Sequence, residues 1–165
     1  MEISELAERY SAGTSERCKA IFSTLFIAAN RLQTLFDHRI PRLTLRQFML
    51  LSIARQSAEP LTLTELGKLL GCSRQNVKKL ALSLEQKGFA RLCRSQYDAR
   101  ALTLVPTETA EEYFRTEFPQ YAGELGTLFS VYSEDEVRTL FDLMMRMYAG
   151  LDKLDALTLK GEEEK

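Results

Sequence analysis

The sequence predicts a mostly helical protein of the α+β class, in which one short β-hairpin interrupts a series of helices. Three observations support this fold class. Apolar residues recur with the period of a helix over most of the chain, and several of these stretches open with a helix-capping pattern. The period changes to that of short strands only in residues 89–106. The 165 residues suffice for one compact domain with helical extensions.

The composition narrows the class of protein. With 45% hydrophobic and 27% charged residues, the chain is globular rather than disordered. No apolar run approaches the roughly 18 residues of a membrane helix, and the acidic, polar residues 1–13 do not resemble a secretory signal. Cys18, Cys72 and Cys93 are odd in number and lack metal-ligand spacing. We therefore expect a cytoplasmic protein without disulfide bonds and without contact to a membrane.

Long amphipathic helices are predicted near both ends of the chain. Apolar residues recur at helical spacing over about residues 15–37, and Pro41 ends any helix there. Ser133 with Glu136 forms a capping-box pattern for a last long helix. The apolar residues of that last helix step by three and four, which is typical of a seam for a partner helix. They are Val137, Leu140, Met144, Met147, Leu151 and Leu154.

Three shorter helices follow Pro41. Thr44 with Gln47 is a capping box for "LRQFMLLSIARQS", and Thr62 with Glu65 is one for "LTELGKLL". The third helix, "RQNVKKLALSLEQK", follows Ser73 as its N-cap, and Gly88 stops it. Only "GCS" separates the last two helices, with Gly71 placed as a C-cap. So short a turn forces the two helices to cross steeply, as they do in a helix-turn-helix unit.

A hairpin and further helices complete the chain. "FARLCR" and "ARALTLVP" are short and rich in β-prone residues, and the polar "SQYD" joins them. Two strands directly after a helix-turn-helix form a wing. Thr107 then opens a helix, "ETAEEYFRTEF", which Pro119 kinks or interrupts before "PQYAGELGTLFSVY" resumes it.

The formal net charge of −1 conceals a basic segment, residues 71–100. Its seven basic residues are Arg74, Lys78, Lys79, Lys87, Arg91, Arg94 and Arg100, and its two acidic residues are Glu85 and Asp98. Seven minus two gives this segment +5, so the other 135 residues carry −6. An anionic partner is therefore expected for this segment alone.

The third short helix has the pattern of a DNA-recognition helix. Its buried stripe is predicted to comprise Val77, Leu80, Ala81 and Leu84. Gln75 and Lys79 then face furthest from the core, with Asn76 and Lys78 on either side, while Arg74 lies nearer the core and is a candidate phosphate ligand. Amides can bond to adenine edges, and cations to guanine edges or phosphates, in a major groove that admits one helix. A solvated helix face would look similar; the tight turn, the hairpin and the local charge favour DNA.

At this point the chain resembles the MarR family of transcriptional regulators. Residues 44–106 are similar to the family's winged helix-turn-helix, most strongly from residue 60 onward. The family's Leu-Glu-x-Lys-Gly stop is matched by residues 84–88, and the Asp-x-Arg of its wing by residues 98–100. The resemblance implies a division into an N-terminal dimerisation helix (1–43), a DNA-binding domain (44–106) and C-terminal dimerisation helices (107–165).

The resemblance also implies a role for the wing. Arg100 would enter the minor groove, with Asp98 orienting it through a salt bridge, and Arg94 would hold a phosphate. A narrow minor groove concentrates negative potential, whereas an exposed ion pair adds under about 1 kcal/mol to stability. The family's wing often begins with Asp-Pro, for which Ser95 and Gln96 stand here. A plain solvated turn is the alternative interpretation.

The predicted function is regulation, most often repression, of transcription by a homodimer on palindromic double-stranded DNA. Two helix-turn-helix units must be held about 34 Å apart to enter successive major grooves. Members of the family often respond to small aromatic or phenolic effectors, and the apolar candidates are Phe22, Phe26, Phe48 and Met49. A core role is the preferred interpretation of these four residues. A winged helix that binds proteins instead of DNA is an alternative.

A second alternative is a redox regulator. Some relatives sense oxidants through a cysteine near the position of Cys18, although this cysteine falls on the apolar stripe and is expected in the core. Cys72 and Cys93 are expected to be small packing residues. One histidine, His38, and no Cys-x-x-Cys pair argue against zinc, so no metal or cofactor is expected. The sequence also lacks a phosphate loop or a nucleophile elbow, and we expect no enzyme.

Overall fold

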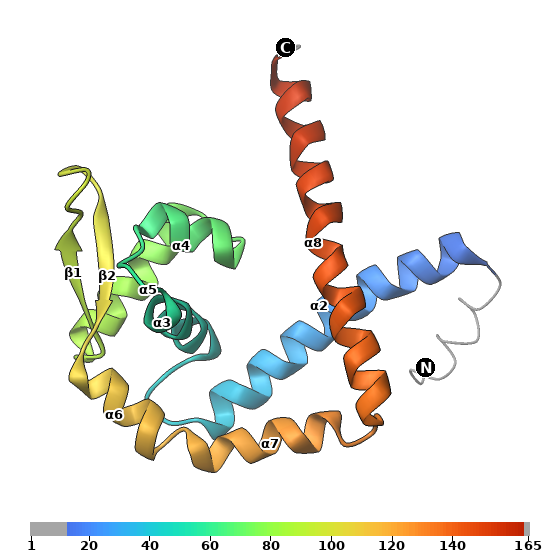
Figure 1. Ribbon diagram of the computed structural model, residues 1–165, viewed down its shortest axis with the longest axis horizontal. Coiled ribbons are helices and arrows are strands. Elements are labelled where there is room, and N and C mark those ends of the chain that lie inside the picture. Colours follow the sequence, from blue (N-terminus) through green and yellow to red (C-terminus); the bar gives the residue numbers. More distant parts are fainter. Residues whose placement is uncertain (1–12, 164–165) are drawn as a thin grey trace. The chain divides into compact units, whose positions relative to one another are not determined.

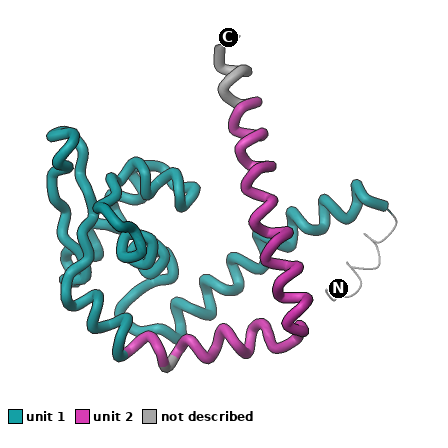
Figure 2. Tube along the Cα trace, viewed as in Figure 1, with its two compact units in different colours: residues 1–116 teal, residues 117–165 magenta. Residues whose placement is uncertain are grey.

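The computed structural model describes residues 13–163, and the side chains of this range except those of residues 120 and 158–163. Figure 1 shows a mostly helical chain with one hairpin, which confirms the predicted fold class. The elements are α2 (Thr14–Arg39), α3 (Leu45–Gln56), α4 (Leu63–Leu70), α5 (Arg74–Gln86), β1 (Ala90–Arg94), β2 (Leu102–Pro106), α6 (Glu108–Thr116), α7 (Pro119–Phe129) and α8 (Glu134–Glu163). The chain divides into two compact units, residues 1–116 and 117–165 (Figure 2).

The predicted capping boxes define where three helices begin. Thr44 Oγ1 accepts a hydrogen bond from the Gln47 backbone N–H, and the Gln47 side chain accepts one from the Thr44 N–H. Thr62 and Glu65 do the same at α4. In the second unit Glu136 accepts hydrogen bonds from the backbone N–H and the hydroxyl of Ser133 at the start of α8. Each box satisfies N–H groups that have no partner within the helix.

The turn between α4 and α5 brings two backbones into close contact. Gly71 is in the left-handed conformation (φ 62°), and the Cys72 N–H donates to the Gly67 carbonyl at 2.9 Å. A Cβ atom on Gly67 would lie 2.7 Å from the Cys72 carbonyl oxygen. Glycine at both positions therefore permits the tight crossing that the sequence predicted.

All buried hydrophobic side chains of the described residues lie between Ile40 and Tyr113. Those with no measurable exposure are Leu50, Leu51, Leu66, Val77, Ala81, Leu84, Leu104 and Ala110. They come from α3, α4, α5, β2 and α6, so one core joins the helix-turn-helix to its hairpin. Leu80, predicted for the buried stripe of α5, is only half-buried at its edge.

The hairpin is attached to the helices through β2. β1 and β2 pair antiparallel with Arg94 opposite Leu102. The Leu104 N–H donates to the Leu61 carbonyl at 3.2 Å, and Thr62 forms a further bridge to Thr103. Strand β2 is thereby fixed to the segment that precedes α4.

The residues outside this core form long helices with exposed apolar side chains. In α2, Phe22 is 64% exposed and Phe26 60%, and Met49 in α3 is 42% exposed, so the preferred core interpretation was wrong for all three. Cys18, which was expected in the core, is exposed. Cys93, which was expected to be a small packing residue, is exposed as well. Among the described residues, no helix has the length and apolar character to cross a membrane.

Two further predictions concern α6, α7 and α3. Pro119 interrupts the helix after Thr107, because α6 ends at Thr116 and α7 begins at Pro119. Phe48 is half-buried and stacks between Phe36 and Phe114, with ring centroids at 5.1 and 5.4 Å. Phe48 is therefore a packing residue, as expected.

Candidate nucleic-acid interface

Helix α5 presents the predicted DNA-reading residues to solvent. Val77, Ala81 and Leu84 have no measurable exposure and fix one face of the helix against the core. Outside this face, five polar or basic side chains in the first two turns are exposed, which are Arg74, Gln75, Asn76, Lys78 and Lys79. Ser73 Oγ accepts the Asn76 N–H at 3.3 Å, so the first turn that bears these side chains is held as helix.

Arg74 is the first residue of α5 and, as the helical count placed it, lies nearer the core-facing side of the helix than Gln75 or Lys79. It is exposed and lines a hollow of about 280 Å³ together with Gln75 and Lys78 of α5, Leu63 of α4 and Leu102 of β2. Two cations and one amide therefore border the space between the recognition helix and Leu102, at the turn end of β2. A phosphate contact is chemically suited to this position.

The wing turn is organised by Asp98, but not in the way that was predicted. The Asp98 carbonyl accepts the Ala101 N–H at 2.9 Å, and Asp98 Oδ1 accepts the Arg100 backbone N–H at 2.8 Å. Within the described part of the chain, the expected salt bridge between Asp98 and the Arg100 guanidinium is not formed. Asp98 thus fixes the backbone that carries Arg100, because aspartate at the start of a turn readily bonds to the N–H two residues on.

The side chain of Arg100 is left exposed at the tip of this turn. Arg94 is also exposed and lies at the end of β1, opposite Leu102. The two arginines therefore stand at the far end of the hairpin, separated from each other only by the turn. Both guanidinium groups are available to a phosphate or a groove.

Sequence reasoning missed two features near this surface. Tyr97 is 83% exposed in the wing turn, and its hydroxyl donates to Glu59 at 3.4 Å. Lys87 was identified as part of the stop motif and of the basic segment, yet its side chain reaches back to residues 42 and 47. No local pattern signals contacts between residues about forty positions apart.

The chemistry of the described residues is that of binding. They contain no group of three or more histidine, cysteine or acidic side chains that could hold a metal ion. The clear pKa shifts lie at two capping boxes, where hydrogen bonds from Thr62 lower the pKa of Glu65 and those from Ser133 lower the pKa of Glu136. Both shifts reflect helix capping.

Comparisons with known proteins agree with this geometry. Residues 43–101 match the model of the MarR family. Over 106 residues the chain is 29% identical to the transcriptional repressor MprA of Escherichia coli K12. The match covers 64% of this chain and spans only 60% of the length of that relative. Two solved structures are similar in fold. A MarR transcriptional regulator from Methanosarcina mazei Go1 has a TM-score of 0.73 at 17% identity, covering 82% of this chain and 99% of that one. MepR of S. aureus, solved in complex with DNA, has a TM-score of 0.68 at 20% identity, and the match covers 79% of this chain and 97% of that one.

Proposed function

Because the chain belongs to the MarR family of transcriptional regulators, we propose that it binds palindromic duplex DNA as a homodimer and represses the genes beside its operators. The family is one of regulators and not of enzymes. The observation that carries the proposal is the exposed face of α5, whose amides and cations stand beside a hairpin that ends in Arg100. The relative MprA is named a transcriptional repressor, which supports repression rather than activation.

In the proposed complex α5 enters the major groove. Gln75 and Asn76 bond to base edges, and Lys78 and Lys79 bond to guanine edges or steer the helix toward the groove. Arg74 and Arg94 hold phosphates on either side of the space between helix and wing. The +5 charge of residues 71–100, in a chain of net charge −1, directs this surface and no other segment toward DNA.

Arg100 is proposed to enter the minor groove beside the reading helix. Asp98 supports this role by fixing the turn backbone, so the arginine side chain keeps its full hydrogen-bonding capacity for DNA. A guanidinium in a narrow minor groove gains more than one on an open phosphate, because the potential there is more negative.

Homodimerisation is proposed through the exposed apolar faces of the long helices. Ile21, Phe22 and Phe26 in α2 are each more than half exposed, and in α8 Phe141, Leu154 and Leu157 are as well. Faces of this size and apolar character are unusual on a monomer and are typical of interfaces. A cytoplasmic location and a response to a small-molecule effector are part of the same proposal, carried by the resemblance alone.

A redox regulator of the same fold is the second candidate. Cys18 is exposed, which is the access that a sensing thiol requires. A Cys18→Ser protein that keeps its response to peroxide would eliminate this candidate.

The proposal is tested by a gel shift with the DNA that flanks the protein's own gene. We expect binding whose affinity falls steeply with salt, since neutralised phosphates release counterions. Binding without salt dependence, or no binding together with capture of a protein partner, would favour a protein-interaction module.

The wing assignment has its own test. Arg100→Ala should weaken DNA binding at least about tenfold, roughly 1.4 kcal/mol, with little change in melting temperature. Arg115→Ala, which removes an exposed arginine from the end of α6, is the matched control and should bind like wild type. Unchanged affinity in Arg100→Ala would contradict the wing assignment.

A further inference from the structure

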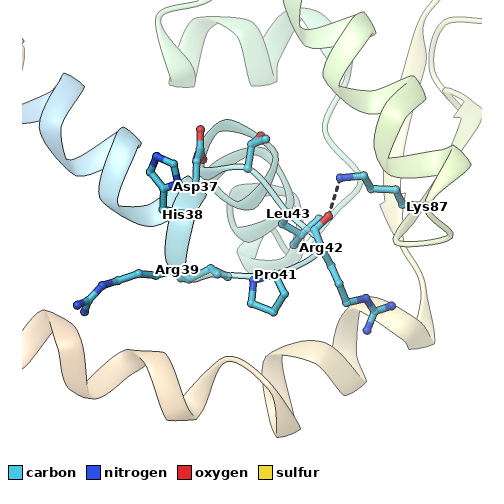
Figure 3. A pocket seen from close by; sticks show the side chains of 9 residues that line it. Asp37, His38, Arg39, Pro41, Arg42, Leu43 and Lys87 are labelled. Atoms are coloured by element: carbon cyan, nitrogen blue, oxygen red, sulfur yellow. Dashed lines mark hydrogen bonds between the residues drawn. The ribbon is translucent and has the colours of Figure 1, made fainter.

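Lys87, at the end of the recognition helix, is bonded to the segment that joins α2 to α3. Its Nζ donates to the Arg42 carbonyl at 2.5 Å and to Gln47 Oε1 at 2.9 Å. Figure 3 shows the side chain of Lys87 extending toward Arg42 across an open hollow of about 400 Å³. The hollow is lined by residues 37–44 and by Lys87, the C-cap residue of α5.

Gln47 connects the same lysine to two helices. Its side-chain amide is buried (6% exposed) and bonded at both its oxygen and its nitrogen: Oε1 accepts the Thr44 N–H at 3.1 Å as well as Lys87, and Nε2 donates to Ser83 Oγ at 2.8 Å. A buried amide that is bonded at both its oxygen and its nitrogen resists displacement, because each lost bond leaves an unsatisfied group. The start of α3 is thereby fixed to the last turns of α5.

The joining segment itself is held in an unusual conformation. Arg42 has φ 74°, a left-handed backbone that residues other than glycine rarely adopt. Its guanidinium lies 4.7 Å from the ring centroid of Phe89, just beyond α5, and Asp37 Oδ1 accepts the Leu45 N–H at 2.6 Å across the segment. A strained residue persists only where its surroundings fix it at several points. We call residues 37–47 with Lys87 the α2–α5 joint.

We propose that Lys87 is a positioning residue, which locks the recognition helix to the end of α2 and so sets the half-site spacing that the dimer reads. The inference rests on the proposed function. Helix α2 carries the exposed apolar face assigned to the dimer, whereas α5 carries the DNA-reading face. The α2–α5 joint therefore determines how each recognition helix is directed relative to the dimer axis. Half-site spacing follows from that direction, because the two helices must enter grooves one turn apart.

The first test measures spacing preference. Wild-type protein selects a palindromic duplex from a random pool, and Kd is measured for it and for versions with one or two base pairs inserted between the half-sites. We expect Lys87→Met to reduce the Kd ratio between inserted and selected duplexes at least about threefold, since a loosened joint accepts wrong spacings. Lys87→Arg, whose cation can donate to the same oxygens, should retain the ratio.

Controls separate positioning from charge and from stability. Lys68→Met removes the same charge from an exposed position on α4 and can weaken all duplexes alike, but it should leave the ratio unchanged. Gln47→Met should lower the ratio by the same factor as Lys87→Met, and the double variant no further, because both act on one set of bonds. An unchanged ratio in Lys87→Met, or a parallel loss for every duplex, would overturn the inference.

The second test needs no DNA. In Lys87→Met the backbone amides of residues 40–47 should exchange hydrogen at least about fivefold faster, while those of the hairpin, residues 90–106, keep their rates. Unchanged exchange in residues 40–47 sinks the inference even if DNA binding is intact. If wild type selects no palindrome, the proposed function fails, and the exchange rates still report whether Lys87 holds the joint.

Discussion

The winged-helix core and the long helices bury their apolar residues to very different extents. Between residues 40 and 113, Leu50, Leu66 and Val77 have no measurable exposure, whereas Phe26 of α2 is 60% exposed and Leu154 of α8 is 60% exposed. The core is thus complete within one chain. The apolar faces of α2 and α8 have the composition of a core without the burial, which suits helices that are stabilised by a second copy.

The largest expected effect comes from the core. Leu50→Ala removes a fully buried side chain, and we expect the free energy of unfolding to fall by about 2–5 kcal/mol, from lost burial and from the cavity left behind. Denaturant unfolding followed by circular dichroism measures this change. A loss no larger than that of an exposed leucine such as Leu69→Ala would contradict the assignment of the core.

The second prediction concerns a variant that should break the proposed dimer and leave the core intact. Phe26→Glu places a charge on the exposed face of α2, where Phe26 contacts Phe22 edge to face at 5.0 Å. Burying an unpaired carboxylate at an interface should raise the dimer dissociation constant at least about 100-fold, roughly 2.7 kcal/mol. Sedimentation equilibrium measures the constant.

The matched control for that variant is Ser23→Glu, which adds the same carboxylate at an exposed polar position of α2. It should dimerise like wild type, because it removes no apolar side chain from the face of α2. Wild-type behaviour of Phe26→Glu, or a wild-type protein that is monomeric at micromolar concentration, would remove α2 from the interface.

Alanine substitutions at two glycines compare the same two regions, the winged-helix core and the long helices, by adding a Cβ atom in each. Gly67→Ala places a Cβ 2.7 Å from the Cys72 carbonyl oxygen in the helix-turn-helix, and should lower the free energy of unfolding by about 1–3 kcal/mol. Gly126→Ala in α7 meets no atom within 4 Å and should instead stabilise its helix by about 0.5–1 kcal/mol. Thermal unfolding of both variants measures the difference. The same sign for both would mean that crowding does not set the turn.

Local patterns predicted the elements of this fold well. The capping boxes of Thr44 and Thr62 and the glycine at residue 71 could be predicted because all partners lie within a few residues. The seam of α8 and the hairpin were likewise expected from period alone. What periodicity does not report is whether an apolar face meets its own chain or another. The exposed Cys18 and Phe22 were for this reason misplaced in the core.

The candidate site shows the same limit at the level of single bonds. Exposure of Gln75 and Lys79 followed from counting turns of α5. The role of Asp98 did not follow, because its carboxylate had the Arg100 N–H within reach as well as the guanidinium, and the turn decides between them. Lys87 was beyond prediction since its acceptors, Arg42 and Gln47, are brought near it only by the tertiary fold.

The smallest predicted effect is a change in the pKa of the glutamate in each of two capping boxes, one in each compact unit. In both, hydrogen bonds lower the pKa of the glutamate below 4.5: the hydroxyl of Thr62, then its N–H, act on Glu65, whereas the N–H of Ser133, then its hydroxyl, act on Glu136. A lowered pKa in the folded state means that each cap stabilises fully above about pH 4.5 and is lost as pH falls through the folded pKa.

Thr62→Ala removes the larger cause of the lowered pKa of Glu65, whereas Ser133→Ala removes the lesser cause of the lowered pKa of Glu136. NMR titration should therefore show the pKa of Glu65 returning further toward 4.5 in Thr62→Ala than that of Glu136 does in Ser133→Ala. Equal returns would mean that hydroxyl and backbone donors contribute alike in the two units.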